Sequence, residues 1–127
     1  MFEKLELIQM AQSLAAQSGA RMAVIAENVA NADTPGYKAK DLPSFAETYA
    51  DDPGQMRTSR PGHLTGSSTA TTPMPKRTRG HESPSGNSVS LEAEMVKSVE
   101  ARQNHDMALA IYRATADVIR ASLGRNR

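Results

Sequence analysis

Residues 28 to 37 read Asn-Val-Ala-Asn-Ala-Asp-Thr-Pro-Gly-Tyr, and this stretch marks the point where a long helix pattern stops and the chain turns. Asn31 is a residue type that can leave a helix in the left-handed conformation. Thr34 is pushed toward extended geometry by the proline after it, and Pro35-Gly36 suits the two central positions of a type II turn. The predicted hinge consists of Asn28, Asn31, Asp33, Thr34, Pro35, Gly36 and Tyr37.

Before the hinge, apolar residues recur at steps of three or four, which is the period of one helix face. A helix from about residue 3 to about residue 31 is predicted, with a length of roughly 43 Å. Gly19 interrupts it at a cost of about 1 kcal/mol relative to alanine, so a bend is allowed there. The predicted packing residues of this helix are Leu5, Ile8, Leu14, Met22, Ile25 and Val29.

A second helix pattern begins near Ser88 or Ser90, either of which can cap it, and continues to the favourable stop at Gly124. Glu92 and Glu94 place acidic side chains in the first turn, where the helix dipole favours them. The apolar residues of this helix form two stripes. The first consists of Leu91, Met95, Val99, Met107, Ile111, Ala114 and Val118, and the second of Leu109, Tyr112, Ala116, Ile119 and Leu123.

Two long helices at opposite ends of a chain most simply pair as an antiparallel or crossing coil. The predicted fold is mainly α, with the N- and C-terminal helices packed as a coiled-coil-like pair and an irregular or partly disordered segment between them. One partner helix cannot cover two apolar stripes. Further helices are therefore expected around the pair, supplied by other subunits.

The middle of the chain carries a weaker pattern. Leu42, Phe45 and Tyr49 stand at steps of three and four, which favours a short helix near residues 42–50 over an extended strip. From residue 53 to 87, prolines, glycines and a Ser/Thr-rich run predict a loop that cannot bury enough apolar surface to offset its ordering entropy. A two-stranded ribbon around Met56 to Leu64 is the one regular element considered there. The predicted division of the chain is 1–37, 38–87 and 88–127.

The formal net charge of +1 hides an uneven distribution. Residues 1–52 carry four Lys or Arg against eight Asp or Glu, residues 53–85 carry five against one, and residues 86–127 carry six against five. Segments of opposite charge suit contacts between neighbouring copies, although salt screens such fields within about 8 Å. The balance is too weakly basic to predict binding to nucleic acid.

The residues that catalysis or metal binding would need are largely missing. His63, His81 and His105 stand far apart, without a second histidine or paired carboxylates at ligand spacing. The sequence has no phosphate-binding glycine loop, nucleophile elbow or dinucleotide fingerprint. We therefore expect no enzyme activity, no cofactor and no metal. The basic run Lys76-Arg77-Thr78-Arg79 could contact nucleic acid or anionic lipid, but a solvated charge run or a contact to an acidic neighbour is favoured.

The sequence has no cysteine, so it predicts neither disulfides nor thiol chemistry. The first residues, Met-Phe-Glu-Lys-Leu-Glu-Leu-Ile, carry acidic side chains where a secretory signal would be basic. No apolar run reaches the length of a membrane span. The expectation is a protein without a cleavable signal or transmembrane helix.

Residues 28–38 closely resemble the N-terminal signature of the bacterial flagellar rod and hook proteins, in which an Asn-rich helix end runs into Thr-Pro-Gly-Tyr. Within that family, residues 86–95 are similar to the matching stretch of proximal rod proteins, although relatives often carry Asp where Ser88 or Ser90 stands here. The resemblance implies a two-helix terminal domain that packs in many copies into a helical tube. That tube is the base of the flagellar drive shaft, next to the membrane ring.

The resemblance also implies binding partners and a route of export. The implied partners are other copies of the chain, other rod and basal-body proteins including the membrane-ring adaptor, and the flagellar type III export apparatus, which would deliver the chain to the periplasmic rod. Early substrates of that apparatus carry a Phe-x-x-x-apolar patch, which Phe45 to Tyr49 could match; two aromatics packed on one helical face is the alternative. Another proximal rod subunit and a two-helix export adaptor or chaperone-like protein are the alternative functions.

Overall fold

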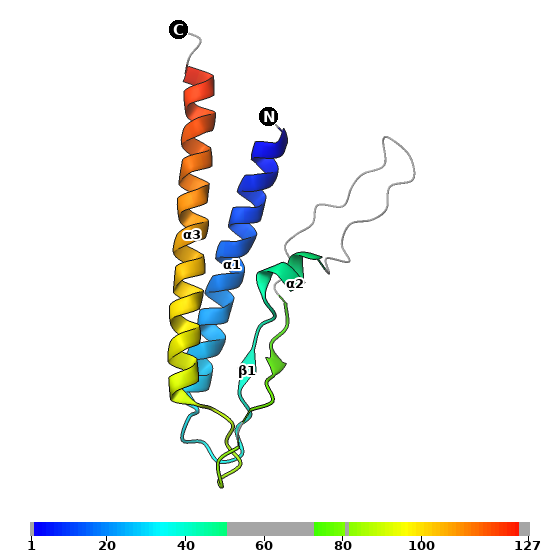
Figure 1. Ribbon diagram of the computed structural model, residues 1–127, viewed down its shortest axis with the longest axis vertical. Helices are drawn as coiled ribbons and strands as arrows, with labels where there is room; N and C mark the ends of the chain where they lie inside the picture. Colours follow the sequence, from blue (N-terminus) through cyan, green and yellow to red (C-terminus); the bar gives the residue numbers. More distant parts are fainter. Residues whose placement is uncertain (1, 51–72, 81, 125–127) are drawn as a thin grey trace, which may run out of the picture.

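The computed structural model describes residues 2–50, 73–80 and 82–124, and for residues 2–5 and 50 the backbone alone (Figure 1). The helices are α1 (Phe2–Ala30), α2 (Phe45–Ala50) and α3 (Leu91–Gly124), and the strands are β1 (Lys40–Asp41) and β2 (Lys76–Arg77). Helices α1 and α3 run antiparallel side by side, so the start of α1 and the end of α3 lie at the same end of this pair. The predicted mainly α fold with two long paired helices is confirmed. The predicted ribbon at Met56 to Leu64 lies outside the described residues.

Local capping chemistry explains where two of the helices start. At α3 the Ser90 Oγ accepts a hydrogen bond from the Ala93 backbone N–H, at 3.4 Å, so Ser90 and not Ser88 is the cap. At α2 the Ser44 Oγ accepts from the Glu47 N–H at 3.4 Å, and the Glu47 carboxylate accepts from the Ser44 N–H at 3.0 Å. This reciprocal pair is a capping box, which stabilises a helix of only six residues.

The contact between α1 and α3 is built from small side chains at a spacing of seven residues. Ala101 and Ala108 of α3 are 1% and 0% exposed, and Ala11 and Ile25 of α1 are also buried. Because seven residues make two turns of a coiled-coil helix, a repeat of seven keeps one face turned to the partner. The full set of buried positions in this repeat is Ala11, Ser18 and Ile25 on α1 and Glu94, Ala101, Ala108 and Thr115 on α3.

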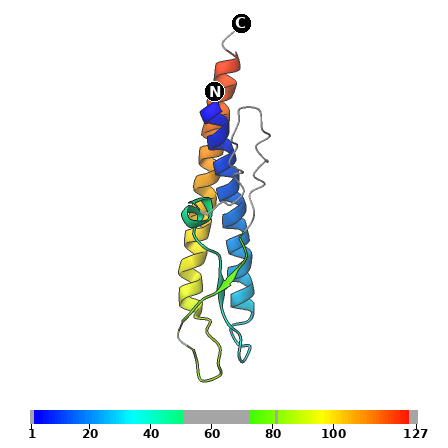
Figure 2. The ribbon, with the colours of Figure 1, turned by 90° about the vertical axis from the view of Figure 1, so that its right-hand side faces the viewer.

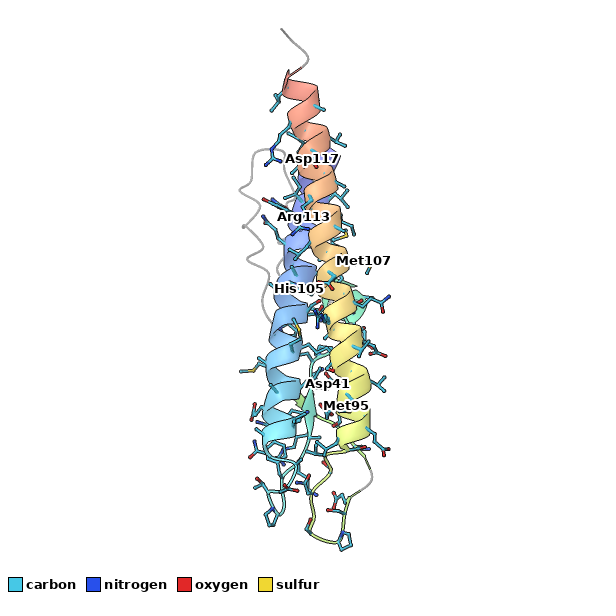
Figure 3. All side chains as sticks on the ribbon, turned by 90° about the vertical axis from the view of Figure 1, so that its left-hand side faces the viewer. Asp41, Met95, His105, Met107, Arg113 and Asp117 are labelled. Carbon is cyan, nitrogen blue, oxygen red and sulfur yellow. The ribbon has the colours of Figure 1, made fainter. Side chains whose placement is uncertain are left out.

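The first predicted stripe of α3 is therefore not the face that meets α1 within one chain. Met95 is 70% exposed and Val99 is 67% exposed. Figure 3 places Met95 and Met107 on the side of α3 that points away from α1. The reason is that small residues allow two helix backbones to approach closely, so alanines rather than the larger apolar side chains occupy the contact. Despite these exposed residues, no described helix is long and apolar enough to cross a membrane.

A strap, residues 37–44, leaves the hinge and runs back along the lower half of the helix pair (Figure 2). Its β1 pairs antiparallel with β2, with Lys40 opposite Arg77 and Asp41 opposite Lys76. The side chains of Ala39 and Leu42 are 3% and 5% exposed and anchor the strap to the helices. The strap then continues into α2, which begins at Phe45.

Candidate functional site: the hinge and the strap

The turn after α1 has the geometry that its sequence predicts. The Tyr37 N–H donates to the Thr34 carbonyl at 3.3 Å, and Gly36 has a φ of +74°. A proline followed by a glycine with positive φ defines a type II turn, so the predicted Pro35-Gly36 turn is confirmed. The prediction for Asn31 was wrong, since no non-glycine residue in the described part of the chain has a positive φ. The Asn31 N–H instead donates to the Glu27 and Asn28 carbonyls, so α1 tightens as it ends.

Asn28 ties the strap to the helix pair. Its side chain is completely buried, and its Nδ2 donates to the Lys40 carbonyl at 2.7 Å and to the Glu94 carboxylate at 3.0 Å. Its Oδ1 accepts from the Lys40 N–H at 3.1 Å and from the Tyr37 hydroxyl at 3.3 Å. An amide has two donors and one acceptor oxygen with two lone pairs, so every hydrogen-bonding position of this side chain is used. Asn28 therefore joins α1, the strap and α3 at one point.

Glu94 brings a buried carboxylate into the contact between the helices. It is 2% exposed and occupies one position of the seven-residue repeat on α3. Besides accepting from Asn28, it pairs with the Lys97 ammonium at 2.9 Å. A buried charge is costly unless it is paired and hydrogen-bonded, and here it is both. A contact made of alanines specifies weakly how α1 and α3 are aligned along their axes. Glu94 is bonded to both Asn28 and Lys97 in one alignment only, and it therefore specifies that alignment strongly.

Arg21 and Asp41 form the second attachment of the strap. The guanidinium of Arg21 donates to both carboxylate oxygens of Asp41, at 3.0 and 3.2 Å, which is the bidentate geometry that arginine favours. Lys97 lies 3.6 Å from Asp41, and Glu100 lies 3.6 Å from Arg21, so both residues of the pair also contact α3. Figure 3 shows Asp41 at the level where the strap passes the two helices.

The charges around Asp41 change its titration. Burial alone would raise the pKa of this carboxyl, but hydrogen bonding and charge from Arg21, the Leu42 N–H and the charge of Lys97 together hold the pKa below its ordinary value of 3.8. The pKa of Arg21 is raised in turn, first by its hydrogen bond to Asp41. The folded chain thus binds a proton on Asp41 less readily than the unfolded chain does.

This shift predicts a loss of stability in acid. A carboxyl whose pKa is depressed by folding contributes fully above its unfolded pKa, and the contribution disappears as the pH falls through the folded pKa. We expect the free energy of unfolding to fall more between pH 6 and pH 3 in the natural chain than in the Asp41→Asn variant. Urea unfolding at the two pH values measures this difference. Equal losses in both proteins would show that Asp41 is not responsible.

Gln17 holds the end of the strap, and the predicted export patch lies just beyond it. The Gln17 Nε2 donates to the Pro43 carbonyl at 2.6 Å. Phe45 lines a small hollow of about 60 Å³ between α1, α3 and the start of α2. The rings of Phe45 and Tyr49 contact each other with centroids 5.6 Å apart, and Tyr49 is 50% exposed. Phe45 thus packs on the helix pair while Tyr49 faces outward.

The structure brings some of the predicted site residues together and separates others. Asn28 and Tyr37 meet at the base of the helix pair. The exposed members of the hinge are Asp33, Thr34, Pro35 and Gly36. Among the predicted packing residues, Ile25 is buried, Ile8, Leu14, Met22, Ile111 and Ile119 are partly buried, and Val29, Leu91, Met95, Val99, Met107, Val118 and Leu123 are exposed. For Leu5 the structure describes only the backbone.

Sequence reasoning missed the polar residues that hold the hinge and the strap. They are Gln17, Arg21, Lys40, Asp41, Asn87, Glu94 and Lys97. One signal was available: between residues 7 and 30 the only charged residues are Arg21 and Glu27. An isolated charge in an otherwise neutral amphipathic helix needs a partner, and both of these residues contact the strap, Arg21 through Asp41 and Glu27 through Lys40 at 2.7 Å.

The described residues offer no donor set for a metal, since no group of three or more His, Asp or Glu side chains converges among them. His105 is the one histidine that the structure describes, and its ring lies 3.9 Å from the Asp106 carboxylate. His63 and His81 lie outside the described residues. What the hinge and strap provide is a joint of hydrogen bonds and ion pairs that connects α1, the strap and α3.

Two comparisons with known proteins indicate the family of this chain. The family model described as "Flagella basal body rod protein" matches residues 8–38, which cover most of α1, the whole hinge and the start of the strap. The flagellar basal body rod protein FlgB of Agrobacterium fabrum is 32% identical to this chain over 120 residues, which span 88% of each protein. An alignment at this identity along most of both sequences reaches well beyond the hinge motif. The chain therefore belongs to the flagellar basal body rod protein family.

Proposed function

We propose that the chain is a structural subunit of the proximal rod, which polymerises into the flagellar drive shaft and transmits torque. The family supports a structural role in the basal body rod. An export adaptor or chaperone-like function, the alternative from a different class, is not favoured by this family. The main structural support for the proposal is the exposure of apolar side chains on one face of α3. This outer face of α3 is defined as Met95, Val96, Val99, Met107 and Val118.

The outer face of α3 is a row of exposed apolar side chains that one chain leaves uncovered. Val96, Val99, Met107 and Val118 recur at 3, 8 and 11 residues, which are close to one, two and three helical turns. Their exposed fractions are 61, 67, 48 and 50%. The face extends for about 33 Å along the helix. Since family members build a rod, other rod subunits are the proposed partners of this face.

A subunit with this face has the mechanical properties that a shaft requires. Side-chain contacts distributed along a helix spread an applied load over many atoms, and close-packed interfaces deform little. The hinge and strap hold α1 and α3 in one register through Asn28, Glu94 and the Arg21–Asp41 pair. Torque applied to one helix would then be passed to the other without sliding.

Further parts of the proposal rest on the resemblance to rod proteins. Export through the flagellar type III apparatus without a cleavable signal would bring the chain to the periplasm, and the membrane-ring adaptor would be a neighbour at the base. Phe45 and Tyr49 are the candidates for the export patch, with Tyr49 the more accessible of the two. The proposed units remain residues 1–37, 38–87 and 88–127, of which the first and last form the helix pair.

The proposal predicts the effect of removing apolar area from the outer face of α3. The double variant Val99→Gln and Met107→Gln should fold with nearly unchanged stability, because both side chains are exposed and glutamine is a good helix former. We expect the amount of the subunit in isolated basal bodies, measured by immunoblot in a strain that lacks the natural copy, to fall at least tenfold, with loss of swimming.

The matched control changes two exposed polar residues of the same helix. Arg102→Gln with Asp106→Gln introduces the same residue type at neighbouring positions and leaves the net charge unchanged. This variant should enter basal bodies and support swimming as the natural chain does. Normal incorporation of the Val99 and Met107 variant, at natural expression and secretion levels, would overturn the role of the outer face.

A further inference from the structure

Asn87 lies outside the hinge motif, yet its side chain contacts three backbone carbonyls of the hinge, just after the end of α1. The Asn87 Nδ2 donates to the carbonyls of Asn31, Ala32 and Thr34 at 2.9, 2.7 and 2.9 Å, and Asn87 is 4% exposed. The Val89 N–H donates to the Asn87 Oδ1 at 2.8 Å, which fixes the orientation of the amide group. A side chain from the far half of the chain thus holds the backbone of the hinge where it leaves the first helix.

The backbone of the hinge needs such donors. Carbonyls in the last turn of α1 are already bonded, since those of Glu27 and Asn28 accept from the Asn31 N–H and that of Val29 accepts from the Ala32 N–H. No basic side chain lies in the last turn of α1, and in the described part of the chain no non-glycine residue adopts the left-handed conformation that commonly closes a helix. The two amide hydrogens of Asn87 instead bind the carbonyls that follow the helix.

The segment around Asn87 contacts the hinge at further points. The Gly36 N–H donates to the Ser85 carbonyl at 3.0 Å, and the Ser88 N–H donates to the Tyr37 carbonyl at 3.0 Å. Gly86, with a φ of +78°, lies against Gly36: a Cβ on Gly86 would stand 3.5 Å from the Gly36 Cα. The Ala39 N–H donates to the Ser88 Oγ at 2.9 Å, so the contact continues into the strap.

We propose that residues 83–89 are a lock segment that sets the shape of the hinge, with Asn87 as its positioning residue. The Thr-Pro-Gly-Tyr turn supplies the local bend, but the orientation of residues 31–37 relative to α1 is fixed by donors that lie more than 50 residues away. The hinge therefore takes its final shape only when the N- and C-terminal parts of one chain have come together. A chain whose C-terminal part has not docked keeps an open hinge and a detached strap.

The identity of Asn87 follows from this geometry. An aspartate of the same size would keep the acceptor for Val89 but would place a carboxylate against three carbonyl oxygens and lose both donors. An alanine would leave the three carbonyls without this partner. Glutamine has the right groups but carries them one methylene farther from the backbone. Asparagine alone combines the length, the two donors and the acceptor.

The test is hydrogen exchange of the full-length chain in solution, compared between the natural protein and the Asn87→Ala and Asn87→Asp variants. We expect the amides of Gly36, Tyr37 and Ser88 to exchange at least tenfold faster in both variants, while amides in the middle of α1 and α3 change much less. Asn104→Ala, another asparagine replaced on the helix pair, should leave hinge exchange unchanged. Natural exchange at the hinge in Asn87→Asp, or an equal increase along the whole chain, would overturn the proposal.

A milder variant keeps the test valid if Asn87→Ala does not fold. Ser88→Ala removes only the acceptor for the Ala39 N–H and should raise exchange at Ala39 and its neighbours in the strap, with the helices unaffected. Unchanged protection of Ala39 would show that the lock segment does not hold the strap. Neither readout depends on assembly of the rod, so the outcome is separate from that of the outer-face experiment.

Discussion

Replacing Asn28 with alanine is expected to lower the free energy of unfolding by about 3 kcal/mol, since a buried polar group that loses its partner costs about 1–3 kcal/mol. Three such groups are affected: the Lys40 N–H, the Lys40 carbonyl and the Glu94 carboxylate. The Tyr37 hydroxyl loses a fourth, longer contact. Urea unfolding of the purified chain, followed by circular dichroism at neutral pH, measures the change.

Asn31→Ala is the matched control for this prediction. Asn31 follows the same helix, and its side chain donates to the Glu27 carbonyl at 2.8 Å, but this contact is exposed to water. Because water can replace an exposed partner, we expect a loss of at most about 1 kcal/mol. Losses of similar size in the two variants would mean that the Asn28 network is not a main source of stability. A large loss confined to Asn28→Ala would agree with a joint that holds α1, α3 and the strap together.

The long helices and the turn were predictable because their causes are local. Apolar residues that recur every three to four positions identify a helix without knowledge of its partner. In the Pro-Gly pair, proline fixes φ at the first central position of the turn and glycine tolerates the positive φ of the second. These signals come from residues within a few positions of one another. The structure agrees with them at α1, α3 and Gly36.

The face through which the helices meet was not predictable in the same way. Apolar periodicity ranks positions by hydrophobicity, and on α3 it favours Met95 and Val99 over Ala101 and Ala108. Two helix backbones can approach closely only where the side chains between them are small, so the contact contains Ala101 and Ala108 instead. Glu94 would be excluded from any core by its charge, and it is accepted there only because Asn28 and Lys97 happen to lie beside it. The contacts that allow this burial involve both α1 and α3, which lie far apart in the sequence, so no single local pattern reveals them.

The strap and its lock segment depend almost wholly on distant contacts. Strands of two residues leave no detectable alternation, so the pairing of β1 with β2 has no signature in the sequence. Asn87 lies in a stretch that also fits an ordinary loop before a capped helix. Its role follows from the position of the hinge carbonyls after α1, which local rules do not specify. Residues 31–37 illustrate both cases: the turn type was predicted correctly, whereas the left-handed conformation considered for Asn31 is absent and the contact with Asn87 was not foreseen.

Gly36→Val is expected to disrupt the hinge while leaving both helices formed. A non-glycine residue at a φ of +74° costs roughly 1–2 kcal/mol, and a β-branched side chain costs more. No atom beyond the neighbouring residues lies within 4 Å of the position that a Cβ on Gly36 would take, so the cost arises in the backbone and not from a clash. Relief of this strain would move Gly36 away from the Ser85 carbonyl, and with it the direction in which the strap leaves α1.

Gly19→Ala separates this backbone effect from the general effect of losing a glycine. Gly19 lies inside α1 with open space around it, so alanine there should raise stability by about 0.5–1 kcal/mol through its better helix propensity. The measurements are helix content by circular dichroism, the midpoint of urea unfolding, and swimming of a strain that carries only the variant. For Gly36→Val we expect nearly natural helix content, a lower midpoint and loss of swimming, because a rod subunit with a redirected strap cannot match its neighbours. A natural midpoint and normal swimming in Gly36→Val would mean that the positive φ of this glycine is not required for the joint.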